Sequence, residues 1–297
     1  MNPAPSVIVF TVLSGLGFGL LAFLGLGFPS PSGGTAFLHW GLGYALAITG
    51  LLASTFHLGH PERALKAFTQ WQTSWLSREA WTSVAALILL SPIALSDWLG
   101  LGWPRLTGTL GAALCVLTVF TTSMIYAQLK TGPRWNHWST PVLFESFALA
   151  GGALLAGQAW IGLYAMIGLA CVMAFTFLDG EHRFARRGQT TGTATGLDRI
   201  GTVSVFEQPH TSPNYLMREM IHVVARKHAA KLRPIALVLA TLIPALCLLG
   251  AATTSDPAIA LPLFVLAALS HLIGAATQRW LFFAQAEHVV GLYYGKR

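Results

Sequence analysis

Charged residues and paired cysteines are both scarce in this sequence. Only 10% of its 297 residues are Asp, Glu, Lys or Arg, whereas 54% are hydrophobic, which lies outside the range of soluble globular domains. The three cysteines stand singly in apolar segments, and no Cys-x-x-Cys pair occurs. The sequence therefore predicts neither a disulfide framework nor a thiolate-bound iron–sulfur cluster in this chain, and it suggests no metal site.

Long stretches of the chain have no charged residue at all. The first 61 residues contain no Lys, Arg, Asp or Glu, and residues 146–178, 234–255 and 257–278 are equally bare. Each stretch exceeds the roughly 20 residues that a helix needs to cross the hydrocarbon core of a bilayer. Backbone groups cannot bond to water in lipid, and continuous apolar runs favour helices over a barrel. The chain is therefore predicted to be all-α, a polytopic membrane helix bundle.

Eight transmembrane helices are predicted, and residues 1–297 together form a single integral membrane domain. The expected spans are 6–28, 37–57, 79–100, 106–129, 141–158, 160–179, 234–253 and 259–285. No basic segment precedes the first run, which favours a retained span over a cleaved signal peptide. Small residues such as Gly19 and Gly152 are expected to let helices approach closely. Only a short break at Gly157 separates the fifth span from the sixth, so one long tilted helix, giving seven spans, is the alternative.

The distribution of basic residues predicts the orientation of the bundle. Sixteen of the eighteen lysines and arginines fall in even-numbered connections and in the C-terminal tail, and the odd-numbered connections hold only Arg105. An excess of Lys and Arg marks cytoplasmic loops. Both termini are therefore expected on the cytoplasmic side of a bacterial inner membrane. Because these cations lie beside spans and form no soluble basic domain, the net charge of +7 does not indicate nucleic-acid binding.

The sixth connection, 180–233, is the longest and is expected to be a cytoplasmic loop. Its second half is predicted to contain an amphipathic helix, in which Leu216, Met220, Val223 and Val224 form one face and basic residues lie on the others. Two interpretations stay open. The helix lies in the headgroup layer against anionic lipid, or it docks a cytoplasmic protein partner.

His57 ends the second predicted span and Glu79 opens the third. Ionisable groups at the edge of the hydrocarbon are costly, so each needs a reason. Antiparallel helices joined by a short connection bring the two side chains to the same depth. An imidazole and a carboxylate can together hold a quinone ring and exchange protons with it, because quinone reduction takes up protons as well as electrons. The plainer alternative is that His57 caps carbonyl groups and Glu79 interacts favourably with a helix dipole.

Four other residues are candidates for this site, each with a plainer alternative. Arg63 orients a quinone carbonyl or Glu79, or it is an anchor at the membrane edge. Tyr126 donates a hydrogen bond to a carbonyl and Trp75 stacks on the ring, although both residue types are also common in the aromatic belt of the membrane interface. Glu145, in the fifth span, conducts protons together with His57 and Glu79, or it caps a neighbouring helix.

Two residues of the last span lie in an apolar stretch and therefore need partners. Arg279 is expected to form an ion pair inside the bundle, with Glu287 or with Glu145. His271 lies deepest, and it is interpreted as a hydrogen-bonded core histidine in preference to a haem ligand.

The segment of residues 57–79 also carries a family pattern. It begins His-Leu-Gly-His-Pro-Glu-Arg-Ala and ends Leu-Ser-Arg-Glu at the next span. This pattern resembles the membrane anchor subunit of dimethyl sulfoxide reductase-type molybdoenzymes, and the likeness extends over most of the chain, as far as Arg279-Trp-Leu-Phe-Phe and His288. The segment of residues 209–220 is similar to the branch of that family that serves cytoplasmic sulfite dehydrogenase.

This resemblance implies an anchor subunit in a three-subunit complex. A molybdenum-pterin catalytic subunit acts on the substrate, a ferredoxin-like subunit carries iron–sulfur clusters, and the anchor binds ubiquinone or menaquinone and no metal. The family's quinone-binding histidine and glutamate match His57 and Glu79. The chain would pass electrons to the quinone pool from sulfite oxidation. A quinol-oxidising anchor of a dimethyl sulfoxide reductase-like enzyme is the alternative.

Two other classes of function fit the sequence less well. A di-haem cytochrome anchor needs facing axial histidines, and the pair His57 and His271 is expected to lie at different depths. A secondary transporter would show repeated, broken helices around a polar site at the midplane. This sequence has no evident internal repeat, and its polar groups gather near one edge.

Overall fold

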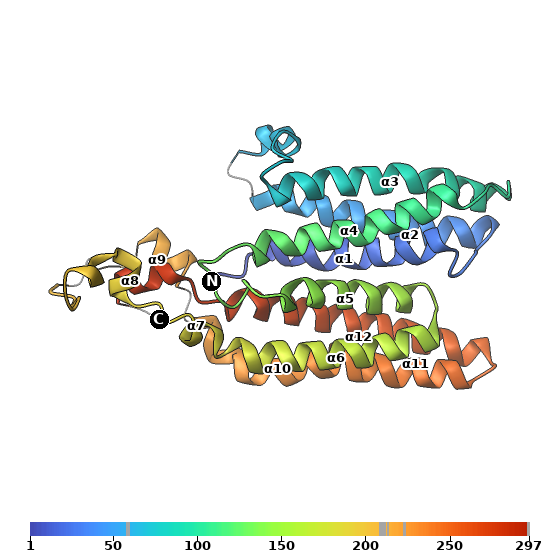
Figure 1. Ribbon diagram of the computed structural model, residues 1–297. Coiled ribbons are helices and arrows are strands. Elements are labelled where there is room, and N and C mark those ends of the chain that lie inside the picture. The colour runs from blue at the N-terminus through green and yellow to red at the C-terminus, as the bar shows by residue number, and fades with distance from the viewer. Residues whose placement is uncertain (58–59, 208–211, 213, 222–223, 296–297) are drawn as a thin grey trace.

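The fold is a bundle of long apolar helices lying side by side, with short helices gathered at one end (Figure 1). The computed structural model describes residues 1–57, 60–207, 212, 214–221 and 224–295, and every regular element within these ranges is a helix. Seven of the described helices are long and apolar enough to cross a membrane, and an eighth apolar helix is shorter. The prediction of an all-α membrane bundle is confirmed.

The bundle consists of two halves that follow one another in the sequence. The first half contains α1 (Pro5–Leu26), α2 (Gly33–Ala53), α3 (Trp75–Leu99) and α4 (Leu106–Ala127). The second half contains α5 (Ser139–Leu155), α6 (Ala159–Gly180), the continuous segment α10 (Ala229–Leu237), η5 (Val238–Leu242) and α11 (Ile243–Thr253), and α12 (Pro257–Ala284). Helices α1 and α4 pack against α5, and α1 also packs against α12. These contacts between the halves are termed the seam.

The predicted spans lie within a few residues of the observed helices. The largest difference is at the continuous segment of α10, η5 and α11, which begins at Ala229 and so before the predicted span 234–253. The connection between α5 and α6 tests the expected alternative of one long tilted helix. Gly157 has a φ of 68°, a left-handed conformation that glycine adopts at little cost, and the two helices flanking it pack against each other. The alternative of one long tilted helix is therefore wrong.

The seam is closest where α1 crosses α5. An ideal Cβ atom on Gly19 would lie 2.1 Å from the carbonyl oxygen of Ala148, and one on Gly152 would lie 2.5 Å from the carbonyl carbon of Gly19. No side chain larger than hydrogen fits at either position without moving a backbone. The two backbones therefore pack directly against each other, as expected for small residues at helix contacts in membranes.

Short helices and connections gather at one end of the bundle, together with the N-terminus (Figure 1). They are η1 (Ser54–His57), η2 (Pro61–Phe68), α7 (Arg183–Arg186), α8 (Thr191–Thr195), η3 (Leu197–Arg199), α9 (Tyr215–Glu219), η4 (Val224–His228) and η6 (Val289–Tyr294). The predicted amphipathic helix corresponds to α9 and η4. Because α9 ends at Glu219 and the described Ile221 is not helical, the prediction of one continuous amphipathic helix is wrong; Val223 lies outside the described residues.

Arginines at this loop-rich end fasten connections to the helices. Asp179 accepts hydrogen bonds from Arg183 Nε at 2.6 Å and from Arg186 Nη1 at 2.7 Å. Arg183 is buried and also donates to the carbonyl oxygen of Arg134 and to Ser139 Oγ, each at 2.8 Å. The fourth and sixth connections are thereby held against the ends of α5 and α6.

At the opposite end of the bundle, the charge of Arg105 is offset by that of Asp97. Arg105 Nη2 lies 2.9 Å from Asp97 Oδ1, and Trp40 Nε1 donates to Asp97 Oδ2 at 3.1 Å. Arg105 also donates to the carbonyl oxygen of Leu24. The one basic residue of the odd-numbered connections is therefore neutralised by an ion pair, which sharpens the contrast between the two ends.

Candidate functional site

Polar side chains from five helices lie at one level of the bundle, between about one and two turns from the helix ends at its loop-rich end. The residues are Thr11 of α1, Glu79 of α3, Thr122 of α4, Glu145 of α5 and Arg279 of α12. Polar and ionisable groups at membrane depth are expensive and face the bundle interior or a cavity. This level is therefore the candidate functional site.

Glu79 is placed by the start of α3. The side chain of Ser74 caps the helix by accepting from the backbone N–H of Ser77, so α3 begins at Trp75 and Glu79 is the fifth helical residue. The sequence had placed it at the first position of the span. Glu79 is 3% exposed, and its Oε1 lies 2.5 Å from Thr122 Oγ1 on α4. The carboxyl group therefore points into the contact between α3 and α4.

Thr122 is the partner that sequence reasoning missed. Its hydroxyl oxygen also lies 2.9 Å from the carbonyl oxygen of Thr118, and a hydroxyl group has one proton to donate. Both bonds form together when the carboxyl group of Glu79 carries a proton, so the pair is arranged to hold that proton or to give it up. The run Thr121-Thr122-Ser123 in an otherwise apolar span was the available signal.

Replacing Thr122 with valine is expected to destabilise the protein by about 1–3 kcal/mol, because the buried carboxyl group of Glu79 loses its hydrogen bond while the volume stays the same. Thermal unfolding of the detergent-solubilised protein measures this. Thr118→Val is the matched control, since among the described residues that buried hydroxyl donates to the Leu114 carbonyl of its own helix, at 2.7 Å, and to no other group. Equal midpoints for the two variants would show that the bond to Glu79 contributes nothing specific.

Tyr126 lies one turn beyond Thr122 in a cluster of aromatic side chains. Its ring centroid lies 5.5 Å from those of Trp135 and Phe282, and 5.8 Å from that of Phe144. Trp135 Nε1 donates to the carbonyl oxygen of Phe282 at 2.9 Å, which fixes the fourth connection to the end of α12. Tyr126 is therefore held between α4, α5 and α12. Its contact with a quinone stays a prediction.

Trp75 occupies the first turn of α3. Its ring lies edge-on to Phe120, with centroids 6.1 Å apart, and the Arg78 guanidinium lies 4.3 Å from its centroid. Arg78 also donates to the carbonyl oxygens of Trp71 and Gln72. These hydrogen bonds hold the preceding connection against the start of α3. Trp75 is half-buried one turn before Glu79. It lies close enough to the site for the predicted role, which these contacts leave untested.

The other two predicted residues fall in the connection before α3. Arg63 is on η2, 60% exposed, with its Nε 3.9 Å from Glu62 Oε1. No contact between Arg63 and Glu79 occurs in the described part of the chain. The backbone of His57 ends η1, but its side chain lies outside what the structure describes. The pairing of His57 with Glu79 therefore stays a prediction.

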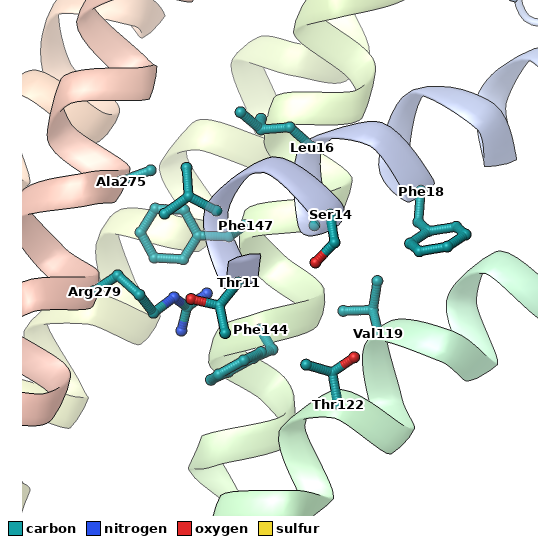
Figure 2. A pocket seen from close by; sticks show the side chains of 12 residues that line it. Thr11, Ser14, Leu16, Phe18, Val119, Thr122, Phe144, Phe147, Ala275 and Arg279 are labelled. Carbon is teal, nitrogen blue, oxygen red and sulfur yellow. The ribbon is translucent and has the colours of Figure 1, made fainter. Parts of the chain in front are cut away.

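Arg279 enters the seam from α12. It is 3% exposed, and its guanidinium carbon lies 3.7 Å from the ring centroid of Phe144 and 5.4 Å from that of Phe147. Figure 2 shows the side chain reaching between these two rings toward Thr11, with Thr122 on the far side of the pocket. An ion pair with Glu287 or Glu145 was expected, but Glu287 lies 3.4 Å from Arg226, and Glu145 forms no ion pair with Arg279 among the described residues. Aromatic faces therefore take the place of an acidic partner.

The pocket beside Arg279 is small and partly polar. Its volume is about 20 Å³, room for about one water molecule, and Thr11, Ser14 and Thr122 contribute hydroxyl groups to its lining. Nε and Nη1 of Arg279 are buried without a hydrogen-bond partner among the described residues. The pocket therefore lies between the guanidinium of Arg279 and the hydroxyl group that bonds Glu79.

His271 has a structural role that follows from Pro244. Proline has no N–H, so the carbonyl group of Ala240, four residues earlier, lacks its helical donor. His271 Nδ1 lies 2.7 Å from that oxygen, and Ser270 donates to the neighbouring carbonyl of Leu239 at 2.8 Å. The interpretation of His271 as a hydrogen-bonded core residue is confirmed at Nδ1, and the π-helical turn η5 marks the place.

Comparisons with known proteins agree over the whole chain. The sequence model of the family described as DMSO reductase anchor subunit (DmsC) matches residues 1–295. The chain is 30% identical over 332 aligned positions to a sulfite dehydrogenase subunit from Allochromatium vinosum, and the match covers 99% of each protein. No solved structure matches the chain significantly.

Proposed function

Because this chain belongs to the DMSO reductase anchor subunit family, we propose that it is the quinone-binding membrane anchor of a three-subunit molybdoenzyme. Its partners are a ferredoxin-like iron–sulfur subunit and a molybdopterin catalytic subunit. Electrons pass from the iron–sulfur subunit to ubiquinone or menaquinone at this chain. The name of the sulfite dehydrogenase relative supports sulfite as the electron source, and therefore supports quinone reduction as the direction.

Glu79 is the residue that carries this proposal. It is a carboxyl group buried between α3 and α4 in a chain that has few charges, and its oxygen lies 2.5 Å from a hydroxyl group. A buried ionisable residue at membrane depth is by default a functional group. Quinone reduction requires protons near the ring, and the Glu79–Thr122 pair exchanges one through hydrogen bonds already in place. His57 is the proposed second proton-exchanging group.

The remaining predicted residues surround this pair. Trp75 lies one turn before Glu79 and offers an aromatic face, and Tyr126 lies one turn after Thr122 and offers a hydroxyl group. Glu145 lies at the same level across the seam and is proposed to relay protons. Arg63 is proposed to orient the ring from η2, on the loop-rich side of Glu79.

The topology supports docking of soluble partners at the loop-rich end. Eight spans are proposed, since the 17 residues of α5 would cover about 25 Å at 1.5 Å per residue, near the lower limit for a span. The basic residues of the even-numbered connections lie at this end, whereas Arg105 at the other end is neutralised by Asp97. We therefore place both termini and the partner subunits on the cytoplasmic side of the bacterial inner membrane.

Removing this chain from the complex is the direct test. The catalytic and iron–sulfur subunits, purified together without it, are expected to oxidise sulfite with a soluble artificial acceptor but not with a quinone. Adding the chain in nanodiscs should restore quinone reduction, followed by the absorbance of quinone and quinol. Quinone reduction at the full rate without the chain would reject the assignment. Quinol-driven reduction of a substrate, with no sulfite oxidation, would reject the direction.

A further inference from the structure

A groove lies on the seam, lined by residues of α1, α4 and α5. Figure 1 shows these three helices side by side. Its volume is about 490 Å³, within the range of pockets that hold small ligands. The groove is lined from α1 by residues between 18 and 23, from α4 by Cys115, Val116, Val119 and Phe120, and from α5 by residues between 141 and 149. Val116 and Leu149 on opposite walls are 52% and 51% exposed, so the groove opens on the surface of the transmembrane region.

Glu145 supplies the one carboxyl group among the described residues that line this apolar groove. Ser146 beside it already donates to the carbonyl oxygen of Val142 at 2.7 Å. Within the described residues, the side chain of Glu145 has no hydrogen bond, and its Oε1 is buried without a partner. A plain acyl chain in the groove would leave this carboxyl group unpaired, which is unfavourable. An occupant that joins a long apolar chain to a ring bearing carbonyl or hydroxyl oxygens would satisfy both parts of the groove.

The polar end of the groove faces the loop-rich end of the bundle, and its apolar part extends away from that end, which suits such an occupant. Glu145 lies in the second turn of α5, which begins at the loop-rich end, whereas Phe23 and Cys115 lie farther toward the other end. Phe18 and Val119 line both the groove and the small pocket that contains Thr122 and Arg279. These two side chains therefore stand between the polar end of the groove and the surroundings of Glu79.

We propose that the seam groove is the lateral access site for prenylated quinone, with the prenyl chain along α1 and α4 and a ring oxygen bonded to the carboxyl group of Glu145. This inference rests on the proposed function. It adds a second quinone contact, the access site, which is distinct from the Glu79–Thr122 pair. Its consequence is selectivity for the tail. A quinone reaches the reactive level through a passage that recognises an apolar chain, whereas a tail-less ring depends on the passage much less.

Filling the groove tests this access. In the assembled complex, Val116→Trp places a large ring in one wall and is expected to raise the KM for a prenylated quinone by roughly tenfold, equivalent to about 1.4 kcal/mol of binding. The KM for a tail-less benzoquinone with the same ring should rise much less. Leu117→Trp is the matched control, because this neighbour is 42% exposed on the same helix but does not line the groove. It should leave both KM values unchanged.

A photoreactive quinone with a diazirine on its prenyl chain locates the binding directly. Label is expected in the peptides that contain residues 115–120 and 141–149, and Val116→Trp should remove it. Glu145→Leu should weaken labelling, whereas Ser146→Ala should not, since that hydroxyl group is already bonded within α5. Co-purification of the catalytic and iron–sulfur subunits with each variant confirms that the variant has assembled.

The outcomes distinguish a failure of the groove proposal from a failure of the proposed function. An unchanged KM for prenylated quinone in Val116→Trp, or an equal rise for the tail-less ring, overturns the groove as the passage for the tail. Label confined to other helices, with quinone reduction intact, overturns the groove and leaves the proposed function standing. Label in the groove of a complex that reduces no quinone supports the groove and rejects the proposed function.

Discussion

Glutamine in place of Glu79 is expected to lower quinone-linked turnover of the assembled complex by roughly 100-fold or more, the usual contribution of a positioned proton-transfer group. Glutamine keeps the size of the side chain and can still accept a hydrogen bond from Thr122, so the packing of α3 on α4 is retained. It cannot release a proton. The measurement is kcat with sulfite as donor and quinone as acceptor. The rate with a soluble artificial acceptor should be unchanged, because that reaction bypasses the membrane.

Glu62→Gln is the matched control for this substitution. Glu62 belongs to the connection just before α3, and its side chain is 61% exposed beside His60 and Arg63. The same chemical change there should leave quinone turnover within about twofold, since solvent screens an exposed pair. Full quinone turnover in Glu79→Gln would remove Glu79 from the site, and an equal loss in Glu62→Gln would show that the effect is one of surface charge.

The double variant with His57→Gln tests whether the two residues act together. If both exchange protons with one quinone ring, the double variant should be no slower than the slower single variant, because residues that act as a unit show strongly non-additive losses. Losses that multiply would place His57 at a separate step. This result would define the relation between His57 and Glu79 that the described residues leave untested.

Alanine at Gly19 is expected to destabilise the bundle by roughly 1–3 kcal/mol or more, the range for overpacking. The new Cβ atom would lie 2.1 Å from the carbonyl oxygen of Ala148, and no change of side-chain rotamer can relieve a clash with a backbone. Helices α1 and α5 would have to separate along the seam. The expected result is a lower thermal midpoint of the purified chain and a lower yield of assembled complex.

Gly15→Ala provides the matched control on the same helix, one turn earlier. An ideal Cβ atom on Gly15 meets nothing within 4 Å, so the substitution has space. Alanine also favours a helix over glycine by about 1 kcal/mol, so this variant should be as stable as the parent or slightly more stable. A midpoint for Gly19→Ala as high as that for Gly15→Ala would show that the two halves do not depend on the close contact at Gly19.

The sequence predicted the helices well because in a membrane one requirement dominates. A segment without charges and long enough to span lipid must satisfy its own backbone hydrogen bonds. The break at Gly157 was readable for a local reason, since glycine takes a positive φ readily. The predicted boundaries differ by a few residues where a polar side chain caps a helix. Ser74 caps α3, so the helix begins at Trp75 instead of at Glu79, where the predicted span began.

The candidate site was only partly predictable from the sequence. The level of Glu79 followed from its place near the end of a span, but its partner Thr122 depends on how α4 is rotated about its axis, which no local pattern fixes. The expected acidic partner of Arg279 proved to be aromatic rings, because Phe144 and Phe147 approach it across the seam. The hydrogen bond of His271 required knowing that Pro244 frees a carbonyl group on a neighbouring helix.

The contacts of Asp179 affect how the loop-rich end attracts a soluble protein. Arg183 and Arg186 both lie within hydrogen-bond distance of this one carboxylate, and Arg183 is buried as well. This one carboxylate cancels one of the two positive charges at short range, so the cluster contributes a single net charge to the potential, which salt screens over a Debye length of about 8 Å at physiological ionic strength. The pull on an acidic partner approaching through solution is therefore weaker than a count of arginines suggests, and added salt should slow the encounter correspondingly less.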